Sequence, residues 1–102
     1  MDKIAMLTEI LTQNPGDAFA RYGLAMEYAN QGKTDSALAE FERLLSTHPE
    51  YTAGYFMAAQ TLVKAGRTDE AKARLAQGIA SAQRTGNAHA LGEMQALLEE
   101  LG

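Results

Sequence analysis

Apolar residues along this chain recur every three or four positions, which is the spacing of a helix with one buried face. The first such stripe predicts a helix that Asp2 caps and that ends before Pro15. A second helix is expected from Asp17 to about Asn30, and it carries apolar residues on two faces, so it needs two neighbours. Because alanine and leucine are frequent and β-branched residues are few, the pattern predicts helices and no strands.

Glycine and proline mark the ends of the later helices. Gly32 is expected to supply the left-handed residue that ends the second helix, and Thr34 with Asp35 to cap the third. The turn between these helices is short, so they should pack antiparallel. Pro49 ends the third helix, and three further helices are expected. The last, over about residues 87–101, has one apolar and one acidic side, as a capping helix should.

The chain contains an internal repeat of 34 residues. Gly32-Lys33-Thr34-Asp35-Ser36-Ala37-Leu38-Ala39 returns as Gly66-Arg67-Thr68-Asp69-Glu70-Ala71-Lys72-Ala73. At the same offset, the first residues of the chain match the second half of a unit, because Leu7 and Pro15 precede Phe41 and Pro49. The expected organisation is one domain with a half repeat (1–16), two repeats (18–51 and 52–85) and a capping helix (86–102). The sequence therefore predicts an all-α superhelix, or solenoid, of antiparallel helix pairs with about six helices.

These residues resemble the tetratricopeptide repeat, a family whose 34-residue unit is an antiparallel helix pair stacked into a right-handed superhelix. The positions that carry the resemblance are Ala25 and Ala59, Tyr28 and Leu62, Gly32 and Gly66, Ala37 and Ala71, Phe41 and Leu75, and Pro49. Two positions depart from the family's pattern, because Arg21 replaces the aromatic residue present as Tyr55 and Gln83 stands at the position of Pro49. Within the repeat of this chain, Gly78 stands where the first unit has Leu44. A close contact with the next helix would explain that glycine.

Composition and charge exclude several classes of function. The 102 residues include 13 acidic and 9 basic side chains, a net charge of −4, with no long basic run, which argues against nucleic acid and anionic membranes. No apolar run is long enough to cross a bilayer, and no signal-peptide core follows Met1, so a soluble, cytoplasmic protein is expected. With 0 cysteines there is no disulfide framework, thiolate nucleophile or cysteine-based zinc site.

No arrangement of residues predicts catalysis or a cofactor. His89 and Glu93 lie four residues apart, which would place them on one helix face at the spacing of a metal or acid–base pair. Without a third ligand the simpler interpretation is two solvated side chains. We expect no enzyme, no metal and no cofactor.

The resemblance implies a binding surface, because the first helices of each pair line the concave groove in that family. The positions that contact peptides there correspond to Phe19, Tyr22, Gly23, Met26 and Asn30 in the first unit, and to Ala53, Phe56, Met57, Gln60 and Lys64 in the second. Their apolar members would make a patch suited to an apolar peptide or an amphipathic helix. The lysine and asparagine with which some members capture a C-terminal carboxylate are replaced by Tyr22 and Met26.

Two alternatives to this groove remain open. The same side chains could be buried within the array, since a helix in a superhelix packs on several sides. The protein could also form a homodimer through the groove or the N-terminal half repeat, where Leu7, Ile10 and Leu11 are candidates for exposure, or by exchange of the first helix. The leading hypothesis is a non-catalytic scaffold that binds another protein.

Overall fold

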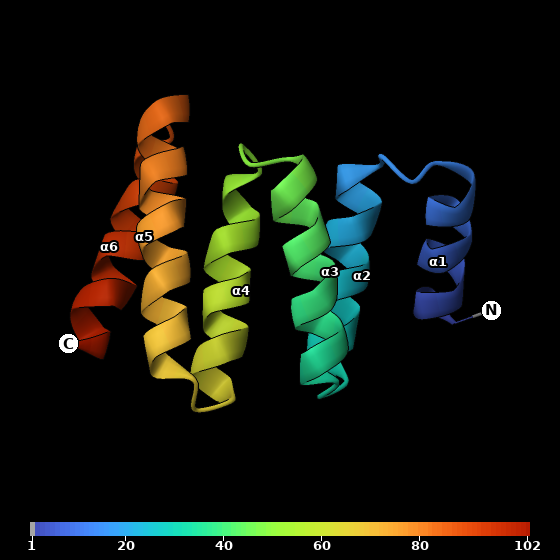
Figure 1. Ribbon diagram of the computed structural model, residues 1–102, viewed down its shortest axis with the longest axis horizontal. Helices are drawn as coiled ribbons and strands as arrows, with labels where there is room; N and C mark the ends of the chain where they lie inside the picture. The colour runs from blue at the N-terminus through green and yellow to red at the C-terminus, as the bar shows by residue number, and fades with distance from the viewer. Residues whose placement is uncertain (1) are drawn as a thin grey trace.

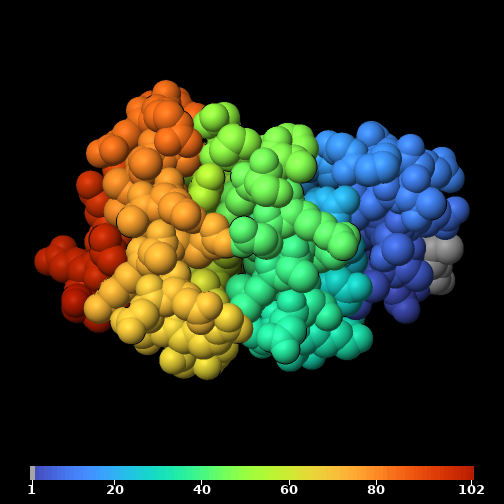
Figure 2. Space-filling view, in the orientation of Figure 1, coloured from blue at the N-terminus to red at the C-terminus, as the bar shows by residue number. Residues whose placement is uncertain are grey.

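The computed structural model describes residues 2–102, which form six helices and no strand. The helices are α1 (Lys3–Gln13), α2 (Ala18–Asn30), α3 (Thr34–Thr47), α4 (Thr52–Lys64), α5 (Thr68–Thr85) and α6 (Ala88–Leu101). They follow one another from α1 at one end to α6 at the other, each antiparallel to the last (Figure 1). The result is an elongated body of 41 × 29 × 19 Å (Figure 2), which confirms the predicted all-α superhelix.

The residues that begin and end the first two helices behave as predicted. The Asp2 carboxylate accepts a hydrogen bond from the Ala5 amide at 2.8 Å, and that of Asp17 accepts one from Ala20 at 3.0 Å. Gly32 closes α2 and Gly66 closes α4, both with a φ of +75°, a conformation that glycine adopts without steric cost.

The predicted cap of α3 is wrong. Thr34 is the first residue inside the helix, and Lys33 precedes it without a side-chain hydrogen bond to the helix. The turn is so short that Lys33 also closes the preceding helix, because its amide donates to the Tyr28 carbonyl at 2.9 Å. Asp35 does lie in the first turn, where its charge favours the helix dipole.

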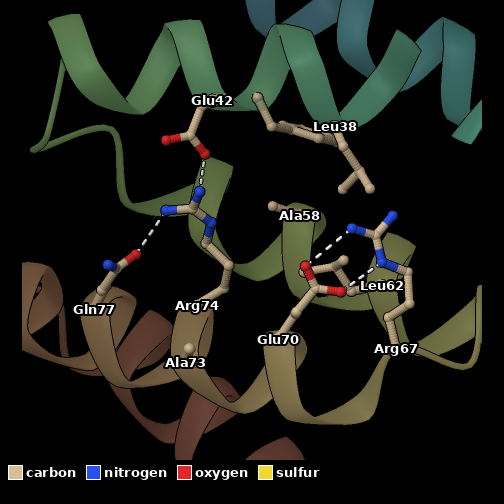
Figure 3. A pocket seen from close by; sticks show the side chains of 10 residues that line it. Leu38, Glu42, Ala58, Leu62, Arg67, Glu70, Ala73, Arg74 and Gln77 are labelled. Atoms are coloured by element: carbon tan, nitrogen blue, oxygen red, sulfur yellow. Dashed lines mark hydrogen bonds and ion pairs between the residues drawn. The ribbon is translucent and has the colours of Figure 1, made fainter. Parts of the chain in front are cut away.

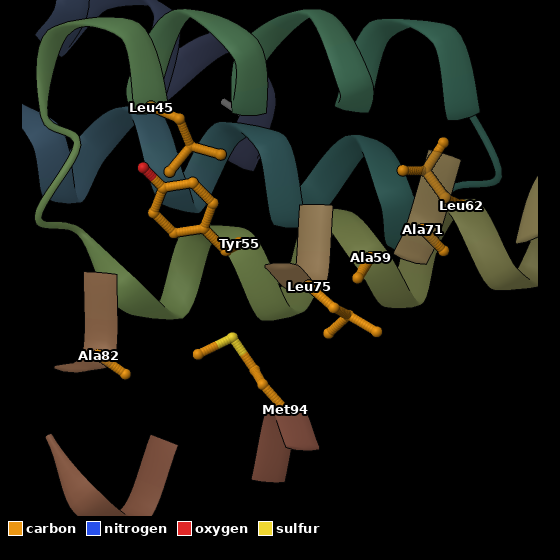
Figure 4. Packing of buried hydrophobic residues seen from close by; sticks show 8 residues of the cluster. All are labelled: Leu45, Tyr55, Ala59, Leu62, Ala71, Leu75, Ala82 and Met94. Atoms are coloured by element: carbon orange, nitrogen blue, oxygen red, sulfur yellow. The ribbon is translucent and has the colours of Figure 1, made fainter. Parts of the chain in front are cut away.

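The largest buried cluster joins α4, α5 and α6 and includes Leu45 of α3 (Figure 4). Its members are Leu45, Tyr55, Ala59, Leu62, Ala71, Leu75, Ala82 and Met94. Gly78 of α5 lies against this cluster, and a Cβ there would come within 2.6 Å of the Tyr55 Cβ and would also overlap the Met94 sulfur. This confirms the prediction that Gly78 permits a close contact with the next helix.

Arg21 and Tyr55 occupy equivalent positions in the repeat, and each donates a hydrogen bond to the carbonyl of the proline that precedes its helix. The Arg21 guanidinium donates to the Pro15 carbonyl at 3.3 Å, and the Tyr55 hydroxyl donates to the Pro49 carbonyl at 2.9 Å. Arg21 also forms an ion pair with Glu40 at 2.6 Å, with both side chains mostly buried. The unusual residue therefore preserves the contact between the proline turn and the following helix.

Candidate functional site

A groove runs along the N-terminal end of the molecule, between α1 and α2. Its volume is about 560 Å³, which lies within the range typical of ligand pockets. Its lining, here called the N-terminal groove, comprises Lys3, Leu7, Ile10, Asp17, Phe19, Ala20, Tyr22, Gly23, Met26, Glu27 and Asn30. Most of this surface is apolar, because the predicted stripe of α2 faces the exposed side of α1.

The exposed large hydrophobic side chains of residues 2–102 gather at this end. Phe19 is 70% exposed, Met6 48% and Ile10 41%. Phe19 and Ile10 line the N-terminal groove, and Met6 lies on the same helix as Ile10. Exposed apolar groups gathered at one site are a recognised mark of an interaction surface.

Tyr22 is half-buried at the groove wall. Its ring lies 5.3 Å from the ring of Tyr51 and 6.4 Å from that of Phe41, measured between centroids. Burial raises the pKa of the Tyr22 hydroxyl above its ordinary value, and the nearby Tyr51 raises it further. This aromatic contact fixes one wall of the N-terminal groove against the α3–α4 connection.

A smaller and more polar groove lies between α2 and α4. This central groove has a volume of about 270 Å³ and is lined by Met26, Ala29, Asn30, Gly32, Thr34, Met57, Gln60, Thr61 and Lys64. Met26 and Asn30 line both grooves, so the two form one continuous surface.

The structure brings seven of the eight candidate residues to these two grooves. Phe19, Tyr22, Met26 and Asn30 line the first, and Met57, Gln60 and Lys64 join the second. Phe56 lines neither groove, because its half-buried ring packs against the cluster of α4, α5 and α6.

Leu11 differs from the expectation of exposure at the N-terminal end. Only 8% of it is exposed, because it packs against Ala20 and Leu24 of α2. Leu7 is half-buried, and Ile10 is exposed as expected.

Charged side chains border the N-terminal groove, and the apolar pattern did not identify them. The Lys3 ammonium lies 3.8 Å from the Glu27 carboxylate, so this ion pair joins α1 to α2. Glu27 also accepts a hydrogen bond from Gln31 at 3.3 Å. The 34-residue repeat could have identified Glu27, because it places this charged residue at the position of Thr61, which is buried.

A third hollow, of about 360 Å³, lies between α3 and α5 and contains two arginines (Figure 3). Arg74 bonds to Glu42 and to Gln77, and Arg67 donates twice to Glu70. The Arg67 hydrogen bond holds the pKa of the exposed Glu70 carboxyl below its ordinary value. Both cations are already engaged, so this hollow offers no ready site for an anionic ligand.

His89 and Glu93 do lie together on the exposed side of α6, with 3.3 Å between Nε2 and Oε1. Within residues 2–102, no cluster of three or more histidine, cysteine or acidic side chains has the arrangement of a metal site. None of the described helices is both long and apolar enough to span a bilayer.

The stacked helix pairs, the 34-residue period and the continuous groove define a helical-repeat scaffold. The sequence profile of the tetratricopeptide repeat family matches residues 28–98, so the chain belongs to this family. Members of the family are generally non-enzymatic scaffolds for interactions between proteins.

Individual proteins support this assignment. A TPR repeat-containing protein of Pseudomonas aeruginosa is 28% identical over 93% of this chain and 90% of its own. The crystal structure of a tetratricopeptide repeat domain protein from Salinibacter ruber is 35% identical, with a TM-score of 0.77, over 83% of this chain and 94% of that one. A crystal structure described as an alternative dimer of the Yersinia enterocolitica translocator chaperone SycD has a TM-score of 0.87 at 18% identity, over 96% of this chain and 75% of that one. At that identity the likeness shows the fold alone.

Proposed function

We propose that this protein binds a segment of a partner protein across the N-terminal and central grooves. The observation that carries the proposal is the continuity of the two grooves through Met26 and Asn30, with exposed Phe19 at one end. Apolar side chains supply the contact area, and Asn30, Gln60 and Lys64 supply polar groups that orient the bound segment.

A retention experiment with matched variants tests this proposal. Met26→Asp places a charge where both grooves meet, whereas Ala96→Asp places the same charge on the exposed side of α6. Proteins from the source cell that bind the wild type and Ala96→Asp should be lost from Met26→Asp, with helicity unchanged by circular dichroism. Equal retention by both variants would contradict binding in the grooves.

A second candidate function is self-association at the N-terminal end. Exposed Met6, Ile10 and Phe19 support it, as does the chaperone structure of similar fold that is described as a dimer. Sedimentation equilibrium of the wild type and Ile10→Asp distinguishes this candidate. A homodimer would appear as a concentration-dependent mass that the aspartate abolishes, and a constant monomer mass in the wild type would exclude it.

A further inference from the structure

The N-terminal groove lies where the repeat would place one more helix. α2 packs against α3 and α4, and α4 packs against α5 and α6. Shifted by 34 residues, α1 corresponds to α3 and α5, so the helix that would precede α1 would border α1 and α2. Those two helices form the N-terminal groove.

Within the described residues, the apolar side chains of α1 have no helix in that position. Leu7 corresponds to Phe41 and Leu75, and each of these has at most 1% of its surface exposed. Ile10 corresponds to Leu44, which is fully buried, yet Ile10 is 41% exposed. At these positions α1 therefore has apolar side chains like those that α3 buries against a neighbouring helix. In α1, no described helix covers them.

α4 shows what kind of helix fits such a position. Its contact with α5 uses Tyr55, Ala59 and Leu62. Fully buried Ala59 allows a close approach, and the larger residues pack one turn away on either side. A helix with a small residue opposite Leu7 and large residues flanking it would match α1 in the same way.

The α2 side of the groove has room for this helix. Gly23 stands at the position of Met57, which packs among Met26 and Ala29 in the central groove. A Cβ on Gly23 would lie 3.5 Å from Leu7, an ordinary van der Waals distance, so the glycine is not required by the packing of α1 on α2. Its absent side chain deepens the groove.

Charge further restricts the occupant. Glu27 lies at the position of Thr61, which is neutral and only 8% exposed beneath the neighbouring helices. A helix that covers Glu27 would remove its carboxylate, and the Lys3 ammonium 3.8 Å away, from water. Because that ion pair is long, a basic side chain on the bound helix would offset the cost of burying the carboxylate.

The area of the patch argues against a second copy of the chain as the occupant. With about 200 Å² for a large side chain, the exposed parts of Met6, Ile10 and Phe19 amount to about 300 Å². A stable interface buries about 800 Å² on each partner.

We infer that the N-terminal groove receives one amphipathic helix of a partner protein, antiparallel to α1, in the position of the first helix of a complete repeat. This helix carries a small residue flanked by large apolar ones and a basic residue near Glu27. The inference rests on the proposed function, and it assigns a secondary structure, an orientation and a composition to the bound segment.

The probe for this site is a synthetic peptide with the sequence of Tyr51–Gly66, acetylated, amidated and fluorescently labelled, because α4 is the template. Fluorescence anisotropy measures its dissociation constant for the intact chain. Gly23→Leu should weaken binding at least tenfold by filling the groove, whereas Gly92→Leu, on α6 with open space around it, should leave binding unchanged. Circular dichroism of the mixture should exceed the sum of its components, because the bound peptide is helical.

Three results would overturn the inference: no binding of the peptide, equal binding to Gly23→Leu and wild type, or no gain of helicity. A partner in the retention experiment could be lost from Met26→Asp and still bind Gly23→Leu. That result would contradict the proposed helix position and leave the proposed function intact. A homodimer that Ile10→Asp abolishes would assign this surface to a second copy and also contradict the inference.

Discussion

Gly78→Ala is expected to destabilise the protein, although alanine is the better helix former. Gly78 lies in the interior of α5, where the substitution alone would add about 1 kcal/mol to the free energy of unfolding. The new Cβ, however, would lie 2.6 Å from the Tyr55 Cβ, next to the backbone of α4, and would overlap the buried Met94 sulfur. Overpacking of this kind costs about 1–3 kcal/mol, and the contact with Tyr55 places this site at the upper end. The expected net loss is therefore about 1–2 kcal/mol.

Urea unfolding followed by circular dichroism measures this loss, and Gly92→Ala is the matched control. Nothing lies within 4 Å of a Cβ on Gly92, so this variant should gain about 0.5–1 kcal/mol from helix propensity. The two substitutions are chemically identical and should change stability in opposite directions. If Gly78→Ala were as stable as Gly92→Ala, with an unchanged dependence on urea, close packing of α5 against α4 and α6 would not be the reason for this glycine.

Three further predictions concern polar groups between the helices. Ser81→Val should cost about 1–3 kcal/mol in urea unfolding, because the fully buried Ser81 hydroxyl bonds to the Pro49 carbonyl and to Thr52; equal stability would show that these bonds contribute little. Arg21→Met should cost about 1–2 kcal/mol, since it leaves the mostly buried Glu40 with only the exposed Arg43 at 3.9 Å, and a double-mutant cycle with Glu40→Gln should show coupling between Arg21 and Glu40. Burial raises the pKa of Tyr22 above its ordinary value of 10.0, so stability should be fully present below pH 10 and fall as the pH rises through the pKa of the folded state. Tyr22→Phe should flatten this alkaline loss in thermal melts, and an unchanged slope would contradict the assignment.

The fold could be predicted from the sequence because its strongest signals act locally. Gly32 and Gly66 end helices by adopting a conformation that other residues avoid, and Asp2 and Asp17 cap helices with their own side chains. The repeat then relates distant residues without any knowledge of contacts. The cap at Thr34 was wrong because three residues serve the end of one helix and the start of the next, which is a property of the whole turn.

The site was less predictable because equivalent residues have different neighbours. Tyr22 and Phe56 occupy the same position in the repeat, yet Tyr22 lines a groove and Phe56 packs against the C-terminal cluster. Glu27 was not predicted because the groove was sought from apolar positions, and this carboxylate lies among the apolar residues that line it. Such differences depend on which helices follow or precede a unit, and the sequence of one unit does not contain that information.

Among the residues that the structure describes, α1 contacts α2 alone, whereas each interior helix has a neighbour on both sides. In a linear array, stability is a sum over units and the interfaces between them, so α1 should detach more often than any interior helix. Amide hydrogens of α1 would then exchange with solvent faster than those of α4 and α5. Because the N-terminal groove exists only while α1 is docked, the fraction of docked molecules would set the apparent affinity for a ligand there. A bound ligand would in turn slow hydrogen exchange in α1. Binding in the N-terminal groove and docking of α1 on α2 would therefore be coupled.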